Sequence, residues 1–255
     1  MVKDVDLLKK RRVVILTATV IITAIYWFTA LWHGPKTGYV KDLIVFHTLF
    51  DGCFAGNQWI DFWQYIYQFA LTVILFVFVP WLIVKFYLRE NFKKLVYRHK
   101  HNKTALIICC ILYPIVIVST FITAKDPVLA YEYPLSKLIG TSWSIFILFE
   151  MAYFFYFFSY ETFYRGFLQF GLLKDKPSIK EIIIVILIQT VITTLFHIGK
   201  PISELSMAAA FGPVFGYVAI RFNSIWYGMI IHFVMNIFID FNVLHSFEKL
   251  PNHFF

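Results

Sequence analysis

Long apolar runs separated by short polar segments dominate this chain. Each run is close to the ~20 residues that an α-helix needs to cross a bilayer. The runs are Val13 to Trp32, Trp63 to Val84, Ala105 to Ala124, Trp143 to Leu173, Ile182 to Ile198, Leu205 to Ile220 and Ile225 to Asp240. The fourth is too long for one straight, untilted crossing. The last two are short, which implies close packing inside a bundle. The pattern predicts an all-α, polytopic transmembrane helical bundle with about seven spans, or eight as the alternative.

Composition favours a membrane protein over a soluble or disordered one. Of the 255 residues, 60% are hydrophobic, 20% are aromatic and only 15% are charged. A soluble domain of this length needs a larger polar surface, and a disordered chain has few aromatic residues. The net charge of +8 comes from basic residues beside the apolar runs, as in cytoplasmic loops. We therefore expect a lipid bilayer and no nucleic acid as a partner.

The distribution of Lys and Arg predicts the orientation, because short cytoplasmic loops are enriched in both. Basic residues at positions 9–12 precede the first run, whereas the next loop has only Lys36 and Lys41. The basic residues after the second run are Lys85, Arg89, Lys93, Lys94, Arg98, Lys100 and Lys103, and a third basic loop has Lys174, Lys176 and Lys180. We expect an integral protein of a bacterial inner membrane whose N-terminus is cytoplasmic.

Ionisable side chains inside the apolar runs are candidates for a functional site, because each costs several kcal/mol unless it meets a partner or a cavity. Glu161 and Arg165 are four residues apart on one helix face, where they can neutralise each other. His197 ends the fifth run. His232 and Asn236 are again four apart and share a face of the seventh run. Three helices thus present polar groups that could converge.

Together, these residue types are able to hydrolyse a peptide bond. A carboxylate near a histidine can activate water, and a second histidine with an amide donor can stabilise the resulting oxyanion. The sequence has no Gly-x-Ser-x-Gly and no His-Glu-x-x-His, the signatures of serine hydrolases and of ordinary zinc peptidases. Taken singly, each group also has a structural interpretation: a Glu–Arg pair can clamp helices, and a histidine at a helix end can lie at the membrane interface.

The order of these residues resembles the family of CAAX prenyl proteases and bacteriocin-processing enzymes (the CPBP or Abi family), which are intramembrane glutamate proteases. The family pattern is Glu-Glu-x-x-x-Arg, then Phe-x-x-x-His, then His-x-x-x-Asn. Here Glu161 with Arg165, His197, and His232 with Asn236 follow that order. The resemblance implies catalytic roles for Glu161, His197, His232 and Asn236, and supporting roles for Arg165, Tyr160 and Glu204.

The resemblance also implies a division of the chain. Residues 1–141 form N-terminal transmembrane helices with a weak family match, residues 142–240 form the CPBP-like catalytic core, and residues 241–255 form a C-terminal tail.

Two positions depart from the family pattern. The first glutamate, which the family uses to activate water, is Tyr160 here, and a tyrosine with a pKa near ~10 is a poor base. The phenylalanine of the second motif falls on Thr193. A working protease then needs Glu161, which we favour, or Glu204, which follows His197, as its carboxylate. Without either, the chain has lost proteolysis.

The resemblance implies an intramembrane CAAX-type endopeptidase that needs no metal or other cofactor. Its substrate would be a membrane-associated or prenylated peptide or a membrane protein. One alternative is a non-catalytic membrane binding or assembly protein, in which the same residues hold helices together. A second is a zinc peptidase, if His197, His232 and Glu161 converge as ligands. A third is a small transporter, because intramembrane charges also mark ion paths.

Overall fold

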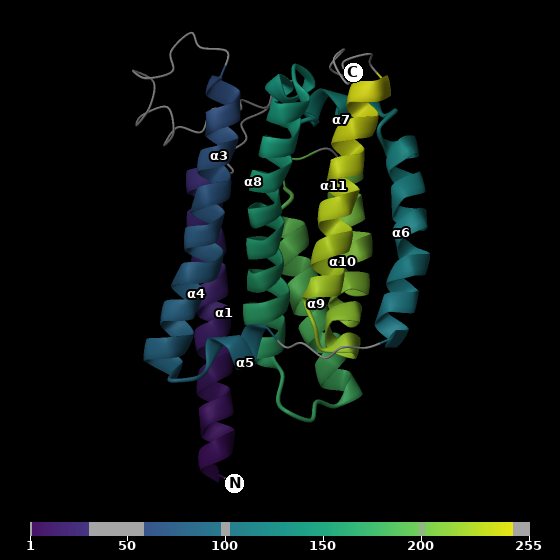
Figure 1. Cartoon of the computed structure of the whole chain (residues 1–255). Helices are drawn as coiled ribbons and strands as arrows, with labels where there is room; N and C mark the ends of the chain where they lie inside the picture. The colour runs from purple at the N-terminus through teal and green to yellow at the C-terminus, as the bar shows by residue number, and fades with distance from the viewer. Residues whose placement is uncertain (1, 31–58, 98–102, 199, 201, 247–255) are drawn as a thin grey trace.

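The structure, a computed structural model, describes residues 2–30, 59–97, 103–198, 200 and 202–246 (Figure 1). Every regular element within these residues is helical. The elements are α1 (Val2–Ala30), α3 (Ile60–Val73), η1 (Ile74–Phe78), α4 (Val79–Leu82), η2 (Ile83–Leu88), α5 (Phe92–Val96), α6 (Lys103–Thr123), α7 (Pro127–Glu132), η3 (Lys137–Gly140), α8 (Trp143–Glu161), η4 (Thr162–Phe170), α9 (Ile179–Leu195), α10 (Ile202–Phe222) and α11 (Trp226–Ser246). The basic residues Lys36, Lys41, Arg98 and Lys100 and most of the predicted tail lie outside the described residues.

Six described helical segments are long and apolar enough to cross a membrane, which makes the chain an integral membrane protein. They are Asp6–Thr29, Ile60–Leu88, Lys103–Thr123, Trp143–Phe170, Ile202–Phe222 and Trp226–Ser246. The remaining predicted run corresponds to α9, which has 17 residues. At 1.5 Å per residue, α9 is about 25 Å long, shorter than the ~30 Å hydrocarbon layer. The long fourth run forms one continuous rod, α8 followed by η4 (Figure 1).

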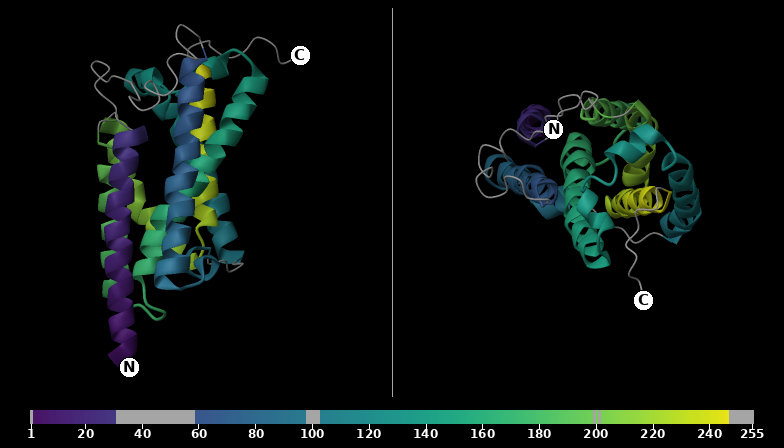
Figure 2. Two further views of the ribbon diagram at one scale, coloured as in Figure 1. Left: turned by 90° about the vertical axis from the view of Figure 1, so that its left-hand side faces the viewer. Right: turned by 90° about the horizontal axis from the view of Figure 1, so that it is seen from above.

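The helices form a bundle with the two described ends of the chain at opposite ends (Figure 1). α3, α8, α11 and α6 follow one another across the molecule, and each packs against the next. α9 and α10 form an antiparallel hairpin that packs against η4 and α11. Figure 2 shows that α1 and the α9–α10 hairpin end at a similar level, short of the outer end of α3. The turn between α9 and α10 therefore lies within the length of the bundle rather than beyond it.

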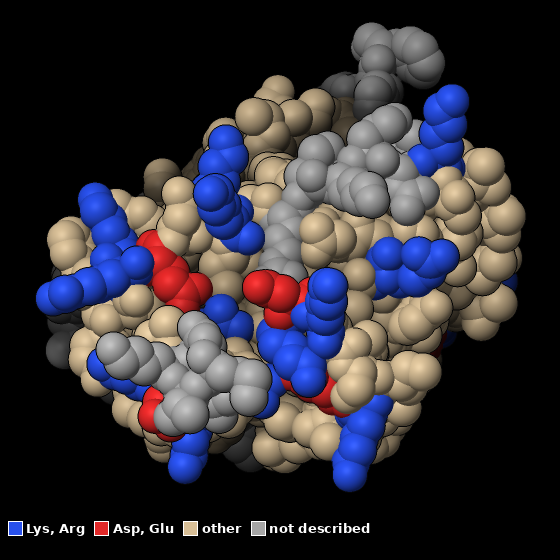
Figure 3. Space-filling view, turned by 90° about the horizontal axis from the view of Figure 1, so that it is seen from below, with Lys and Arg blue, Asp and Glu red and all other residues tan. Residues whose placement is uncertain are grey.

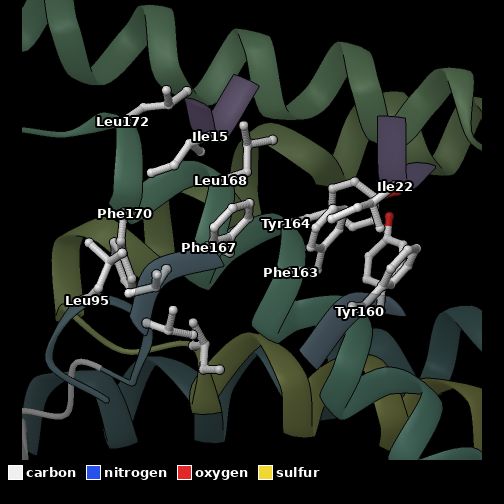
Figure 4. Packing of buried hydrophobic residues seen from close by; sticks show 14 of the residues in the cluster. Ile15, Ile22, Leu95, Tyr160, Phe163, Tyr164, Phe167, Leu168, Phe170 and Leu172 are labelled. Carbon is white, nitrogen blue, oxygen red and sulfur yellow. The ribbon is translucent and has the colours of Figure 1, made fainter. Parts of the chain in front are cut away.

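The π-helical segment η4 is the centre of the largest apolar cluster, and all nine of its residues are buried. Phe163 stacks on Phe76 of η1, with ring centroids 4.5 Å apart, and also on Phe167 one turn later. Ile15 of α1 and Leu95 of α5 pack against the same cluster (Figure 4). Wide π-helical turns are frequent at functional sites in proteins. Here the wide turns lie directly after Glu161, where α8 ends.

Basic residues surround the end of the bundle that includes the N-terminus (Figure 3). Two of them hold helix ends together. Arg11 donates a hydrogen bond to the Leu173 carbonyl at 2.6 Å, and Arg12 donates one to the Leu172 carbonyl at 2.8 Å. Arg12 also pairs with Glu181 at the start of α9. These contacts satisfy carbonyl groups that a helix C-terminus leaves without partners. The arginines therefore fix α1 to the core, beyond any role in orientation.

Close packing of α9 against α10 depends on glycine. A Cβ atom at Gly216 would lie 3.1 Å from Oε1 of both Gln169 and Gln189, closer than ordinary van der Waals contact. Gln169 of η4 also donates a hydrogen bond to the Gly216 carbonyl at 2.7 Å. Small residues at helix interfaces allow such close approach inside membranes. At Gly216, α10 therefore packs closely against both η4 and α9.

We expect Gly216→Leu to destabilise the protein by about 1–3 kcal/mol, the usual cost of overpacking a filled interior. Thermal unfolding in detergent measures the effect. Ala210→Leu, on an exposed face of the same helix, is the matched control and should leave the melting temperature nearly unchanged. Equal loss of stability in both variants would contradict the packing described for Gly216.

Candidate active site

A cavity of about 100 Å³ lies inside the bundle, at the end of α9 that meets α10. This volume has room for several water molecules. Its described walls come from α7, α8, η4, α9, α10 and α11. The lining includes Tyr160, Arg165, His197, Lys200, Glu204, His232 and Asn236. Polar groups that are far apart in the sequence therefore line one cavity.

His197 lies just after α9, and a backbone hydrogen bond fixes its ring. Its Nδ1 is 2.7 Å from the carbonyl oxygen of Thr193, one turn earlier. Because a carbonyl only accepts hydrogen bonds, Nδ1 is the ring nitrogen that bears the hydrogen. In the neutral ring, Nε2 then has no hydrogen and can accept a hydrogen bond, and the side chain lines the cavity.

The Nε2 atom of His197 faces a carboxylate. Glu204 Oε1 is 3.9 Å from Nε2, and the Nζ atom of Lys200 is 2.7 Å from the same oxygen. A neutral Nε2 and a carboxylate oxygen are both acceptors, so they cannot hydrogen-bond to each other directly. One water molecule could donate a hydrogen bond to each of them. The separation suits that bridging position.

A second histidine–carboxylate pair lies across the cavity. His232 Nδ1 is 3.2 Å from Glu161 Oε1, and Arg165 Nη1 is 3.0 Å from the same oxygen. The Glu161 side chain is only 1% exposed and is not among the described residues that line the cavity. The carboxylate of Glu161 thus lies behind His232 and Arg165. It can orient the His232 ring, since a carboxylate favours a hydrogen on the facing nitrogen.

Asn236, one turn after His232, connects the cavity to a further acid. Its Nδ2 is 3.5 Å from Oε2 of Glu150 on α8, a long hydrogen bond. Glu150 in turn lies near Asp240, and both carboxyl groups are buried. An amide NH₂ has two hydrogens, so one remains for a group in the cavity.

Tyr160 occupies the position of the first family glutamate and lies in the cavity wall. The guanidinium carbon of Arg165 is 5.4 Å from the centre of its ring, within the range of a cation–π contact. Its ring also contacts Phe196 and His232 edge-on. Tyr160 therefore places an aromatic ring in the cavity wall beside His232, at the sequence position where the family has a glutamate.

Of the residues predicted from the sequence, six line the cavity: Tyr160, Arg165, His197, Glu204, His232 and Asn236. Glu161 lies one contact away, through His232 and Arg165. Lys200 and Tyr133, which also line the cavity, were not predicted. The four-residue spacing of Lys200 and Glu204 could have indicated the first of these, whereas Tyr133 reaches the cavity only through the placement of α7.

The zinc alternative requires three ligands at one point. In the part of the chain that the structure describes, no group of three or more His, Cys, Asp or Glu side chains is arranged to hold a metal ion. His197 pairs with Glu204, whereas His232 pairs with Glu161.

The fold and the site define a polytopic membrane protein with a polar, histidine-containing cavity inside its helices. Residues 141–238 match the sequence model of the Rce1-like family, described as type II CAAX prenyl endopeptidase Rce1-like. The resemblance to the CPBP family is thereby confirmed over this segment, which includes α8 to most of α11. This is a family of proteases, so the match indicates a hydrolase. No curated protein and no solved structure matches the chain significantly.

We expect Arg165→Met to destabilise the protein by about 3–5 kcal/mol, because it leaves the buried Glu161 carboxylate without a cation. Thermal unfolding in detergent measures the loss. Adding Glu161→Gln should recover part of it, since the uncompensated charge is then gone. Arg221→Met, at an exposed position of α10, is the matched control with an effect within about 0.5 kcal/mol. A normal melting temperature for Arg165→Met would refute the pairing.

Proposed function

We propose that the protein is an intramembrane endopeptidase of the CAAX type. It hydrolyses a peptide bond in a membrane-associated or prenylated peptide or membrane protein. The observation that supports this most is the pair of acceptors, His197 Nε2 and Glu204 Oε1, 3.9 Å apart in a cavity that His232 and Asn236 also line. The family match over residues 141–238 supports the same reaction.

In this proposal, a water molecule between His197 and Glu204 loses a proton to this pair as its oxygen attacks the substrate carbonyl carbon. His232 and the free hydrogen of the Asn236 amide stabilise the oxyanion that forms. The same proton then passes to the leaving amine as the carbon–nitrogen bond breaks, so that no other reactant is consumed. Glu161 orients His232, and Arg165 balances the charge of Glu161.

The choice of carboxylate follows from position. Our sequence analysis favours Glu161 as the base, and that assignment stays a prediction. The geometry favours Glu204, because it lines the cavity beside His197, whereas Glu161 is buried behind two of its partners. Both histidines and Asn236 keep their proposed roles in either case.

We expect wild-type protein in liposomes to cleave fluorescent peptides, and His197→Ala and Glu204→Gln to lower kcat by about 100-fold or more, the range for loss of a general base. Asn236→Ala should lower kcat by about 10²–10³-fold, as for loss of an oxyanion donor. Prenylated and unprenylated peptides, analysed by mass spectrometry, define the substrate class and the cleaved bond. Activity that survives a chelator would oppose the zinc alternative.

Two variants of residues outside the cavity, one histidine and one glutamate, serve as controls. His245→Ala, at the exposed end of α11, and Glu90→Gln, whose carboxylate pairs with Arg11, should both retain activity, because neither side chain lines the cavity. Loss of cleavage in Glu161→Gln, with full activity in Glu204→Gln, would move the base to Glu161.

A non-catalytic binding or assembly protein is the second candidate, and one observation favours it: the ring of Tyr160 occupies the place of the first family glutamate. In that case wild-type protein would cleave none of a broad set of peptides. Cleavage that begins only when the glutamate is restored, in Tyr160→Glu, would decide for this candidate.

We also propose that the N-terminus is cytoplasmic and that the membrane is a bacterial inner membrane. The basic residues around the N-terminal end of the bundle support this orientation (Figure 3). In a variant without native cysteines, Asp175→Cys should react with an impermeant maleimide only after the membrane is permeabilised. Labelling of intact cells would reverse the orientation.

A further inference from the structure

Lys200 is a cation inside the bundle that the proposed reaction does not use. Its side chain is 14% exposed and lines the cavity. Its Nζ atom is 2.7 Å from Glu204 Oε1 and 5.8 Å from the centre of the Tyr133 ring. An ammonium group in such surroundings is costly unless it is paired, so Lys200 and Glu204 depend on each other.

We propose that Lys200 is a positioning residue that holds Glu204 as a carboxylate in the orientation required beside His197. This inference rests on the proposed function. In the part of the chain that the structure describes, the hydrogen bond from Lys200 goes to Glu204, so the inferred effect of Lys200 on the reaction passes through that side chain. Without a cation, a carboxylate buried in an apolar bundle takes up a proton and can no longer accept one from water.

The two carboxylate oxygens of Glu204 differ in their hydrogen bonds, and this difference supports the role of Lys200. Oε1 accepts the hydrogen bond from Lys200, whereas the buried Oε2 has no hydrogen-bond partner among the described residues. The bond to Lys200 restrains rotation of the carboxylate and so keeps Oε1 beside Nε2 of His197, where the two atoms can share one water molecule.

The second histidine of the cavity is built in the same way. Arg165 contacts Oε1 of Glu161, and that oxygen faces His232. Each histidine thus has a carboxylate, and each carboxylate has a cation four residues away in the chain. A purely structural ion pair would not need a histidine beside it, and the repetition indicates that the cation serves the histidine–carboxylate unit.

Among the described residues, Glu132 at the end of α7 is a second acid near Lys200. Together with Tyr153 and Tyr156, these residues line a smaller adjoining cavity. Glu132 could therefore form an ion pair with Lys200 if Glu204 were neutral. For this reason Glu204→Gln need not unfold the protein.

A double-mutant cycle in liposomes tests the inference. Lys200→Met should lower kcat by about 10- to 100-fold, the value of one charge-assisted hydrogen bond, with little change in KM. Lys200→Arg should restore most of the activity. In the Glu204→Gln background, Lys200→Met should have no further effect, because Lys200 acts only through Glu204. Lys125→Met, at an exposed position between α6 and α7, is the matched control.

Three results would overturn the inference: independent, multiplicative losses in the double variant; a raised KM with unchanged kcat in Lys200→Met, which would make Lys200 a substrate-binding residue; or equal inactivity of folded Lys200→Arg and Lys200→Met.

Infrared difference spectra against Glu204→Gln provide a readout that needs no activity. They should show an ionised Glu204 in wild-type protein and a protonated carboxyl group in Lys200→Met. An ionised Glu204 in both would overturn the role of Lys200. If wild-type protein cleaves no peptide but the spectra change as expected, the proposed function fails while the pairing of Lys200 with Glu204 stands.

Discussion

Compensation of charge inside an apolar bundle is the constraint on which the site depends. A bilayer offers no water to solvate an isolated ion, so a charged side chain must meet an opposite charge or a polar cavity. Arg165 and Glu161 meet this condition at 3.0 Å with almost no exposure, in the segment where η4 packs on every side. Once that pair is fixed, His232 has a defined partner, and the α8–η4 rod has a defined rotation relative to α11.

The features that depend on the periodicity of a single helix could be predicted from the sequence. Apolar runs indicated the spans, and four-residue spacings placed Glu161 with Arg165 and His232 with Asn236 on common faces. The spacing rule assumes 3.6 residues per turn. It does not describe the wider turns of η4, so the orientation of the residues after Glu161 could not be derived from it.

The sequence could not show which side chains of different helices lie close together. Nothing in the order of residues shows that Glu161 lies behind His232 while Glu204 faces His197. That arrangement comes from the short α9, whose turn ends within the bundle and brings Glu204 to the level of the other polar groups. It also comes from α7, which adds Tyr133 to the cavity from outside the family-matched segment. The positions of the α9–α10 turn and of α7 both result from packing between elements. Residue spacing within a single helix gives no information about such packing.

The four-residue spacing of both ion pairs has a consequence for biosynthesis. A chain enters the membrane from its N-terminus, so Glu161 must be accommodated before His232 has been made. Because Arg165 follows it within about one turn, the acid and the base can leave the translocation channel as a neutral unit, with no need to wait for a later helix. Lys200 and Glu204 have the same spacing and the same advantage. Each histidine–carboxylate unit is thus provided with its counter-ion by the nascent chain itself, and α11, which is made after these pairs, then brings His232 to a partner already in place.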